Sequence, residues 1–386
     1  MLIEKTRTWA EIHLDRLTAN IKKIQAAANG CEIMAVVKAN AYGHGDCAVA
    51  CCLEKCGIHR FAVSNIDEAL SIRKICPDSE ILILGYTHPS HADILSDSNI
   101  IQGIISSEYA EELSQYAVKC GKTVRAHIKL DTGMGRVGLR CSSVGEYADE
   151  CVKTAMLEGI AAEGIYTHFS VADSDSKDDI EFTAMQRDCI RNVYRAANKV
   201  LPDERKIRYI HYLNSAAMCY GADADGSDIR SSFVRAGIIM YGLMPNSALA
   251  LPLKLEPVME FKSVISHIKT VEAGTPISYG RTFIAPHRME IATLPVGYAD
   301  GYPRLLSSKG EIIINGKRCA ITGRICMDQL MCDVTGANAH VGDIATLFGI
   351  DGNEMITADE LADAYGSIGY ELICGISKRV PRIIIE

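Results

Sequence analysis

Two kinds of hydrophobic pattern alternate along the first 245 residues of the chain. Short apolar or β-branched runs are separated by longer stretches with helical spacing, such as Asp67–Cys76 and Ala110–Val118. The apolar runs cover Glu32–Ala39, Arg60–Asn65, Glu80–Tyr86, Ile100–Ile105, Arg125–Asp131, Gly164–Ser170, Tyr209–Ser215 and Phe233–Gly242. Runs that polar residues rarely interrupt are typical of parallel strands buried on both faces.

This pattern predicts an α/β fold. Eight strand–helix units in about 235 residues give about 29 residues per unit, the size of the repeat in a closed barrel. A doubly wound open sheet is the alternative, but it needs no eighth strand and usually has fewer residues. We therefore predict a (β/α)8 barrel of the TIM type over residues 1–245.

The pattern changes after Pro245. The segment Phe261–Glu272 alternates between apolar and polar residues, and Glu311–Ala320 carries Asn-Gly between apolar arms, a strong hairpin signal. Ala358–Tyr365 is the one clear helical pattern in this part. We therefore predict a second, smaller and mostly antiparallel β domain over residues 246–386.

Composition and charge exclude several classes of protein. The net charge is −8 and the basic residues form no long run, so we expect no nucleic-acid partner. The 15 cysteines are an odd number without CxxC pairs, which favours free thiols in a reducing cytoplasm and no metal site. No apolar run reaches the ~18 residues of a membrane span. We expect a soluble chain, unless a membrane segment was removed from a longer parent.

Lys38 is the first candidate for chemistry. It follows an apolar strand in the segment AVVKANAYGHG, so its ammonium is expected at the C-terminal mouth of the barrel, where barrel enzymes keep their sites. A lysine at a strand end is more often simply solvated. A desolvated lysine, however, would have a depressed pKa that suits Schiff-base chemistry.

AVVKANAYGHG resembles the pyridoxal-phosphate lysine motif of the alanine racemases. Seven further segments resemble that family in its order: KLDTGMGRVG (129–138), YTHFS (166–170), LNSAA (213–217), VRAGIIMYG (234–242), SYGRTF (278–283), VGYADGYPR (296–304) and GRICMDQ (323–329). The similarity covers nearly the whole chain. It implies a barrel followed by a β domain, which is also what the periodicity predicts, and pyridoxal 5'-phosphate as cofactor.

The resemblance implies a two-base racemase that supplies D-alanine for peptidoglycan. Lys38 would hold the cofactor and act as one base, and Tyr279 would be the second base. In the family this tyrosine enters the site from the other subunit, so we expect a homodimer with shared sites. Two bases on opposite faces are what racemisation requires, because one removes the α-proton and the other returns a proton to the opposite face.

The resemblance also assigns cofactor contacts. Arg235 would lie against the pyridine nitrogen, and His211 would orient this arginine. Because arginine keeps its proton, the ring nitrogen would stay unprotonated, which weakens the electron sink and disfavours transamination. The remaining implied contacts, most of them to the phosphate, are those of Tyr42, His168, Asn214, Ser215, Gly237, Ile238 and Tyr370.

Substrate contacts follow from the same resemblance. Arg136 and the backbone of Met327 would bind the substrate carboxylate, and Arg136 would also pair with the phenol of Tyr279. Lys129 matches a position that is carbamylated in some family members. Tyr298 resembles an entry-gate tyrosine and Asp328 a neighbour of the site, although each could equally be structural.

Two departures keep a second substrate open. Many family members have a tyrosine where this chain has Lys378, and many continue beyond the position of Glu386. The short ending is similar to the catalytic domains of vancomycin-resistance serine racemases, which also act on alanine. Tyr370 opposes that interpretation, because those enzymes tend to carry a smaller polar residue there. We favour alanine, with serine as a minor substrate.

Two alternatives come from other classes. Non-enzymatic pyridoxal-phosphate carriers resemble the barrel alone, so the residues after Pro245 argue against a carrier. Decarboxylases of basic amino acids combine a barrel and a β domain, but they pair the ring nitrogen with a carboxylate. Arg235 argues against that class.

Overall fold

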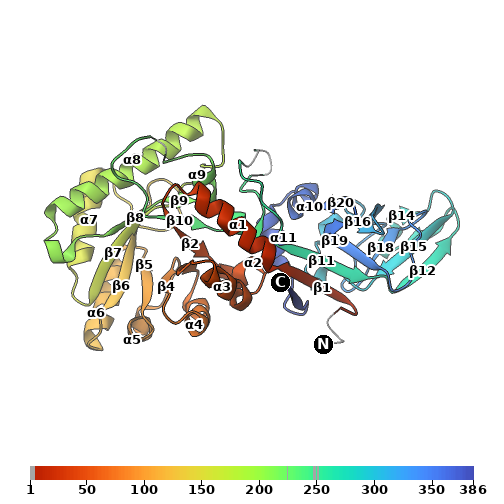
Figure 1. Cartoon of the computed structure of the whole chain (residues 1–386), viewed down its shortest axis with the longest axis horizontal. Helices are drawn as coiled ribbons and strands as arrows, with labels where there is room; N and C mark the ends of the chain where they lie inside the picture. The colour runs from red at the N-terminus through yellow and green to blue at the C-terminus, as the bar shows by residue number, and fades with distance from the viewer. Residues whose placement is uncertain (1–4, 224, 247–248, 250–251) are drawn as a thin grey trace.

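A computed structural model of the chain describes residues 5–223, 225–246, 249 and 252–386. It has two regions, a barrel surrounded by helices and a group of mostly antiparallel sheets, joined end to end (Figure 1). Among the described residues, no helix is both long and apolar enough to cross a membrane. The first four residues of the predicted barrel segment 1–245 lie outside the described residues.

The barrel is formed by nine parallel strands in the order β8-β7-β6-β5-β4-β3-β2-β10-β9. The predicted barrel is thereby confirmed and the open sheet is excluded. The seventh predicted run is divided at Tyr212 into β8 and β9, which complete the ring by pairing with β7 and β10 respectively. The strands are β2 (Glu32–Val36), β3 (Arg60–Val63), β4 (Glu80–Ile83), β5 (Ile100–Ile104), β6 (Val124–Lys129), β7 (Ile160–Tyr166), β8 (Tyr209–His211), β9 (Leu213–Asn214) and β10 (Phe233–Ala236).

Several helices of the barrel begin directly after an asparagine or serine that caps the helix N-terminus. Asn65, Ser106, Ser143 and Ser176 each accept a hydrogen bond from a backbone N–H of the first helical turn, which satisfies a donor that has no partner within the helix. The helices predicted near Asp67–Cys76 and Ala110–Val118 are confirmed as α4 and α6. The helices of this region are α1 (Leu14–Ala27), α2 (Lys38–Tyr42), α3 (Asp46–Lys55), α4 (Ile66–Ile75), α5 (Ala92–Asp97), α6 (Ser107–Lys119), α7 (Val144–Met156), α8 (Lys177–Val200) and α9 (Ser215–Cys219).

The second region contains the predicted hairpin. Asn315 and Gly316 have φ values of 52° and 71° between β16 and β17, the left-handed pair that a two-residue turn requires. The alternating segment Phe261–Glu272 was predicted as one pattern, but it forms two strands in two sheets, with the change at Ile265 and Ser266. The strands are β11 (Met259–Val264), β12 (His267–Val271), β13 (Pro276–Ile277), β14 (Phe283–Ile284), β15 (Met289–Leu294), β16 (Glu311–Ile314), β17 (Lys317–Ala320), β18 (Leu330–Asp333), β19 (Ile344–Asp351), β20 (Glu354–Ile356) and β21 (Arg382–Ile385).

The N-terminal strand β1 (Thr8–His13) does not belong to the barrel. It pairs with β11 antiparallel and with β21 parallel, inside the large sheet of the second region. The predicted division at residue 245 therefore does not describe this strand. A six-residue strand cannot reveal its partners locally, because they follow some 250 and 370 positions later in the sequence.

Two helices follow β20. The helix α10 (Ala358–Tyr365) has the predicted bounds, and Thr357 caps it by accepting a hydrogen bond from the N–H of Glu360. The helix α11 (Gly369–Gly375) was not predicted. It packs against α2 and so brings Tyr370 and Cys374 from the second region to the mouth of the barrel.

Candidate active site

A cavity of about 910 Å³ opens at the C-terminal ends of the barrel strands. Most of the predicted site residues line it, although they come from distant parts of the sequence. They are Lys38, Tyr42, Lys129, Arg136, His168, Asn214, Ser215, Arg235, Gly237, Ile238 and Tyr370. The fold thus brings these residues together at the mouth of the barrel.

Lys38 stands at the start of an unusual backbone turn. The next four residues, Ala39 to Tyr42, all have left-handed φ values of 52° to 55°, and none of them is glycine. Each such residue costs roughly 1–2 kcal/mol relative to right-handed backbone. Burial and the nearby Arg136 guanidinium lower the pKa of Lys38. The turn therefore presents an amine that gives up its proton more readily than an exposed lysine.

Two phenols lie together at one end of the cavity. The rings of Tyr42 and Tyr370 have centroids 6.2 Å apart, and burial raises the pKa of both. Both hydroxyls therefore stay protonated and can donate hydrogen bonds. A Cβ atom on Gly237 would lie 2.8 Å from the Tyr42 hydroxyl, so the absence of a side chain there leaves room for that group.

Ser215 and Gly237 are hydrogen-bonded to each other and line the cavity together with these phenols. The N–H of Gly237 donates to Ser215 Oγ at 3.0 Å, which leaves the hydroxyl proton of Ser215 free to donate elsewhere. The side chain of Asn214 caps α9 by accepting from the N–H of Ala217 at 2.8 Å. This end of the cavity thus gathers hydrogen-bond donors that suit an anion.

Arg235 is 4% exposed and points into the barrel from β10. Its Nη1 donates to His211 Nδ1 at 2.9 Å, and its Nη2 donates to the carbonyl of Thr167 at 2.7 Å and to His168 Nδ1 at 3.2 Å. Burial lowers the pKa of Arg235 to about 10, so it remains charged at neutral pH. Since a guanidinium only donates, both histidine Nδ1 atoms must accept.

A third histidine, His127, extends this series of hydrogen bonds, and it was not among the residues predicted from the sequence. If Nδ1 of His211 accepts, its Nε2 carries the proton and donates to His127 Nδ1 at 2.9 Å. Burial and neighbouring arginines lower the pKa of His127 to about 3 and hold the pKa of His211 well below its usual value. A Cβ atom on Gly164 would lie 2.7 Å from the His127 ring. The signal in the sequence was alternation, since His127 precedes Lys129 by two positions on β6 and shares its side of the strand.

Lys129 is almost fully buried, with 3% of its surface exposed. Its Nζ donates to the carbonyl of Leu130 at 2.9 Å, and burial together with the charge of Arg235 lowers its pKa to about 7. Arg136 lies in the loop that follows β6. That loop is shaped by Asp131, whose carboxylate accepts the N–H groups of Gly133 and Gly135.

Five predicted residues do not line the cavity of their own chain: His211 is fully buried against Arg235, and the other four lie elsewhere. Tyr279, Met327, Tyr298 and Asp328 are exposed on the second region, with Tyr279 71% exposed. They lie on adjoining segments, because the N–H of Tyr298 donates to the carbonyl of Cys326, and Ser278 Oγ donates to the carbonyl of Arg324. Within the described chain, Lys38 and Tyr279 are thus on two separate surfaces.

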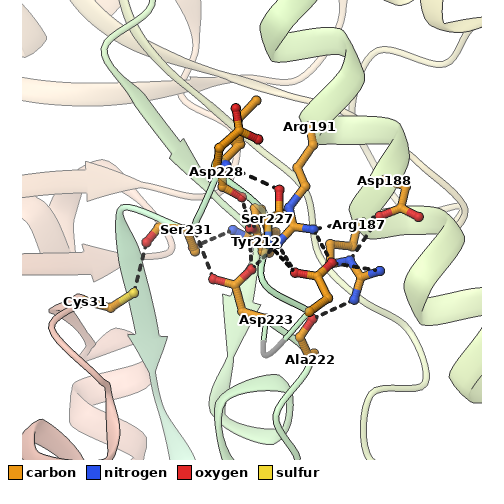
Figure 2. A network of polar contacts seen from close by, with 12 residues as sticks. Cys31, Arg187, Asp188, Arg191, Tyr212, Ala222, Asp223, Ser227, Asp228 and Ser231 are labelled. Carbon is orange, nitrogen blue, oxygen red and sulfur yellow. Dashed lines mark hydrogen bonds and ion pairs between the residues drawn. The ribbon is translucent and has the colours of Figure 1, made fainter.

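A polar network, which was not predicted from the sequence, lies behind the segment that carries Asn214 (Figure 2). Arg191 of α8 donates to the hydroxyl of Tyr212 at 3.0 Å and forms ion pairs with Asp223 and Asp225. The hydroxyl of Tyr212 donates to Asp223 at 2.6 Å. The backbone N–H of Tyr212 turns away from the strand ladder to Ser231 Oγ, which explains the break between β8 and β9. The network therefore fixes the segment that carries His211 and Asn214.

Comparisons with known proteins agree with this geometry. Residues 12–245 match the family described as "Alanine racemase, N-terminal domain", and residues 258–384 match "Alanine racemase, C-terminal domain". The chain is 42% identical to alanine racemase 1 of Clostridium acetobutylicum, over 98% of this chain and 95% of the relative.

Solved structures give the same result. An alanine racemase of Clostridium difficile 630 superposes with a TM-score of 0.89 at 37% identity, covering 99% of this chain and 96% of that one. The alanine racemase of Bacillus anthracis with bound L-Ala-P superposes with a TM-score of 0.88 at 34% identity, covering 99% and 95%.

Proposed function

This chain belongs to the alanine racemase family, and we propose that it interconverts L-alanine and D-alanine with pyridoxal 5'-phosphate held at Lys38. One observation carries the proposal. The cavity gathers four basic side chains, Lys38, Lys129, Arg136 and Arg235, and none of them forms an ion pair with a carboxylate of the described residues. Such a site suits a phosphate and a substrate carboxylate.

The residues present fit the cofactor. The hydroxyl proton of Ser215, the N–H of Ile238 and the phenols of Tyr42 and Tyr370 would hold the phosphate end. Gly237 leaves the space that this group needs, because a Cβ atom there would meet the Tyr42 hydroxyl. Lys38 would hold the aldehyde end, while His168 and Asn214 would lie beside the ring.

The proposed reaction moves one proton between two faces of the α-carbon. The bound cofactor supplies an electron sink for the electron pair left on that carbon. Lys38 Nζ takes or gives the proton on one face, and its lowered pKa makes the unprotonated amine more accessible than that of an exposed lysine. The phenol of Tyr279 does the same on the opposite face.

Arg235 decides which reaction is favoured. Its guanidinium would donate to the ring nitrogen, and it is held in place by His211 and the carbonyl of Thr167. A donor leaves that nitrogen unprotonated, so the electron sink is weak and side reactions are limited. A decarboxylase would need a carboxylate at this position. A cofactor carrier would not need the second region.

The exposure of Tyr279 supports a homodimer with shared sites. We propose that Tyr279 and Met327 complete the cavity of the partner subunit, Met327 through its backbone. Arg136 would bind the substrate carboxylate and the phenol of Tyr279, with Tyr298 at the entry and Asp328 beside it. Asp328 forms an ion pair with Arg379 at 2.7 Å, which supports a structural role for Asp328 in addition to its place beside the entry.

Lys129 suits the carbamate found in some family members. With a pKa of about 7, a large part of its amine is unprotonated at neutral pH, the form that adds to carbon dioxide and releases a proton. The carbamate would pair with Arg136. A carbon-13 NMR carbamate signal after incubation with labelled bicarbonate, absent in Lys129→Met, would support this role. If the unmodified protein shows no carbamate signal, the proposed role of Lys129 is wrong.

The cellular setting is also a proposal. The cysteines of the described residues are all free thiols, which supports a reducing cytoplasm. D-alanine made there would supply peptidoglycan. For all residues except β1, we retain 245/246 as the proposed domain boundary.

The experiment that tests the function is a chirality assay on cofactor-loaded protein. L-alanine and L-serine are offered separately at equal concentration, and the D-enantiomer is counted over time. We expect fast D-alanine and slow D-serine, because Tyr370 fills the space near the substrate. Faster D-serine would identify a serine racemase, and no D-product from either would reopen the carrier and decarboxylase alternatives.

A further inference from the structure

The left-handed turn after Lys38 must be held from outside, since left-handed backbone in four successive non-glycine residues is unfavourable. At its C-terminal end, the carbonyl of Gly43 accepts a hydrogen bond from Arg382 Nε at 2.9 Å. At its N-terminal end, the N–H of Ala39 donates to Glu68 Oε1 at 2.7 Å. Ala39 directly follows Lys38, so this second contact is the one that bears on the amine.

Glu68 binds two strand ends at once. While Oε1 accepts from Ala39, beyond the end of β2, its Oε2 accepts from the N–H of Ser64 at 2.7 Å, just beyond the end of β3. Both bonds are short and both involve a charged acceptor, which makes them stronger than neutral hydrogen bonds. The Glu68 carboxylate therefore links the ends of two neighbouring strands, β2 and β3, at the edge of the cavity.

The neighbour Asp67 provides the contrast. Asp67 and Glu68 both lie in the first turn of α4, where an acidic residue stabilises a helix through its N-terminal N–H groups. Asp67 is exposed and has no side-chain hydrogen bond or ion pair recorded in the described structure. Asp67 shares the first helical turn with Glu68 but makes neither the bond to Ala39 nor the bond to Ser64, so the role at the left-handed turn belongs to Glu68.

We propose that Glu68 is a positioning residue, whose carboxylate holds the left-handed turn and thereby aims Lys38 and Tyr42 into the cavity. The inference rests on the proposed function in one respect, that Lys38 binds the cofactor. Glu68 does not touch the reacting atoms. It acts through the N–H of Ala39 and through its charge.

The charge of Glu68 opposes the other groups around Lys38. Burial and Arg136 lower the pKa of Lys38, whereas Glu68 and the thiol of Cys374 on α11 raise it. Removal of the Glu68 charge should therefore lower this pKa further. The hydrogen-bond effect and the charge effect can be separated, because glutamine keeps one accepting oxygen but no charge.

The test compares Glu68→Gln, Glu68→Ala and the control Asp67→Asn, each purified with its cofactor. The first measurement is the rate at which the visible band of lysine-bound pyridoxal phosphate disappears when a scavenger removes the released cofactor. We expect release about tenfold faster for Glu68→Gln, faster again for Glu68→Ala, and unchanged for Asp67→Asn. Far-ultraviolet circular dichroism checks that all variants are folded.

The second measurement is the pH dependence of cofactor recapture by the stripped proteins, which follows the unprotonated fraction of Lys38. Glu68→Gln and Glu68→Ala should move the midpoint to lower pH by the same amount, because both remove one charge. If Glu68 only stabilised the fold, its substitution would not change the pH midpoint of cofactor recapture. The proposal is overturned if both Glu68 variants match Asp67→Asn in release rate and midpoint. If the unmodified protein shows no visible band with pyridoxal phosphate, the proposed function fails instead.

Discussion

The two ends of the barrel use charge in opposite ways. At or near the N-terminal ends of the strands, three arginines and three glutamates alternate in a connected series of ion pairs: Glu32–Arg60, Arg60–Glu80, Glu80–Arg125, Arg125–Glu163 and Glu163–Arg208. At the C-terminal ends, Lys38, Lys129, Arg136 and Arg235 form no such pair within the described residues. The N-terminal end, here called the closed end, therefore has its charges neutralised in ion pairs. The C-terminal end, here called the open end, keeps basic groups without carboxylate partners, which favours the binding of anions.

The backbone follows the same division. At the closed end, the left-handed non-glycine residue Asn99 stands singly before β5, and the Arg60 guanidinium packs over the Phe233 ring at 4.7 Å. The open end contains the four left-handed residues after Lys38. Strain and unpaired charge both cost stability, and both occur where the proposed chemistry takes place. The comparison suggests that changes at the open end should affect reactivity, and changes at the closed end stability.

The largest effect is expected at Lys38. Lys38→Ala should abolish the visible band of the bound cofactor and reduce racemisation by about a thousand-fold or more, because it removes both the proposed attachment point and one of the two proposed bases. Absorbance and D-alanine formation measure the two losses. Lys55→Ala, an exposed lysine on α3, is the control and should behave as the unmodified protein. A normal band in Lys38→Ala would contradict the assignment.

Tyr279 should give the next largest effect. Tyr279→Phe is expected to keep the cofactor but to slow proton exchange by about a hundred-fold, chiefly for one enantiomer, since only one face loses its base. Rates measured separately from L-alanine and D-alanine test this, with Tyr194→Phe on α8 as control. Full racemisation in both directions would remove the two-base assignment, and full activity from a strict monomer would remove the shared site.

The closed end should respond in stability only. Arg125→Met leaves Glu80 and Glu163 with one cation each in place of two, and we expect a loss of about 1–2 kcal/mol in the free energy of unfolding. Activity per folded molecule should not change. Denaturant unfolding with Arg195→Met, which breaks an exposed ion pair with Asp228 and an exposed hydrogen bond to Asn192, provides the control. A selective loss of activity in Arg125→Met would break the comparison.

The last prediction concerns the pH dependence of stability at Lys129. Its pKa falls from the usual lysine range to about 7 in the folded state, so between about pH 7 and 10 the unfolded state binds more protons. The folded state is penalised fully below pH 7, and this penalty disappears as the pH rises. Lys129→Met should therefore be more stable than the unmodified protein at pH 7, with the gain shrinking by pH 9.5. Unfolding at both pH values in buffers free of carbon dioxide tests this, and an equal gain at both would contradict it.

The sequence predicted the barrel because its evidence is local and repeated. Each apolar run, such as Glu80–Tyr86, reports its own burial, and the helices at Asp67–Cys76 and Ala358–Tyr365 carry their own spacing. Asn315–Gly316 likewise contains the whole chemistry of its turn. Lys38 and Arg235 could be named as candidates because each stands at a strand end within a segment that resembles the alanine racemase family.

Other features depended on partners that no local pattern reveals. The strand β1 joined β11 and β21 across most of the chain, and α11 became visible only where it packs against α2. His127 and Arg191 acquired their contacts through residues 84 and 32 positions away. The amino-acid pattern by itself determined which segments form strands and which residue types stand at their ends. The tertiary structure alone decided which charges meet and which stay unpaired, because ion pairing depends on distances in space and not on spacing along the chain.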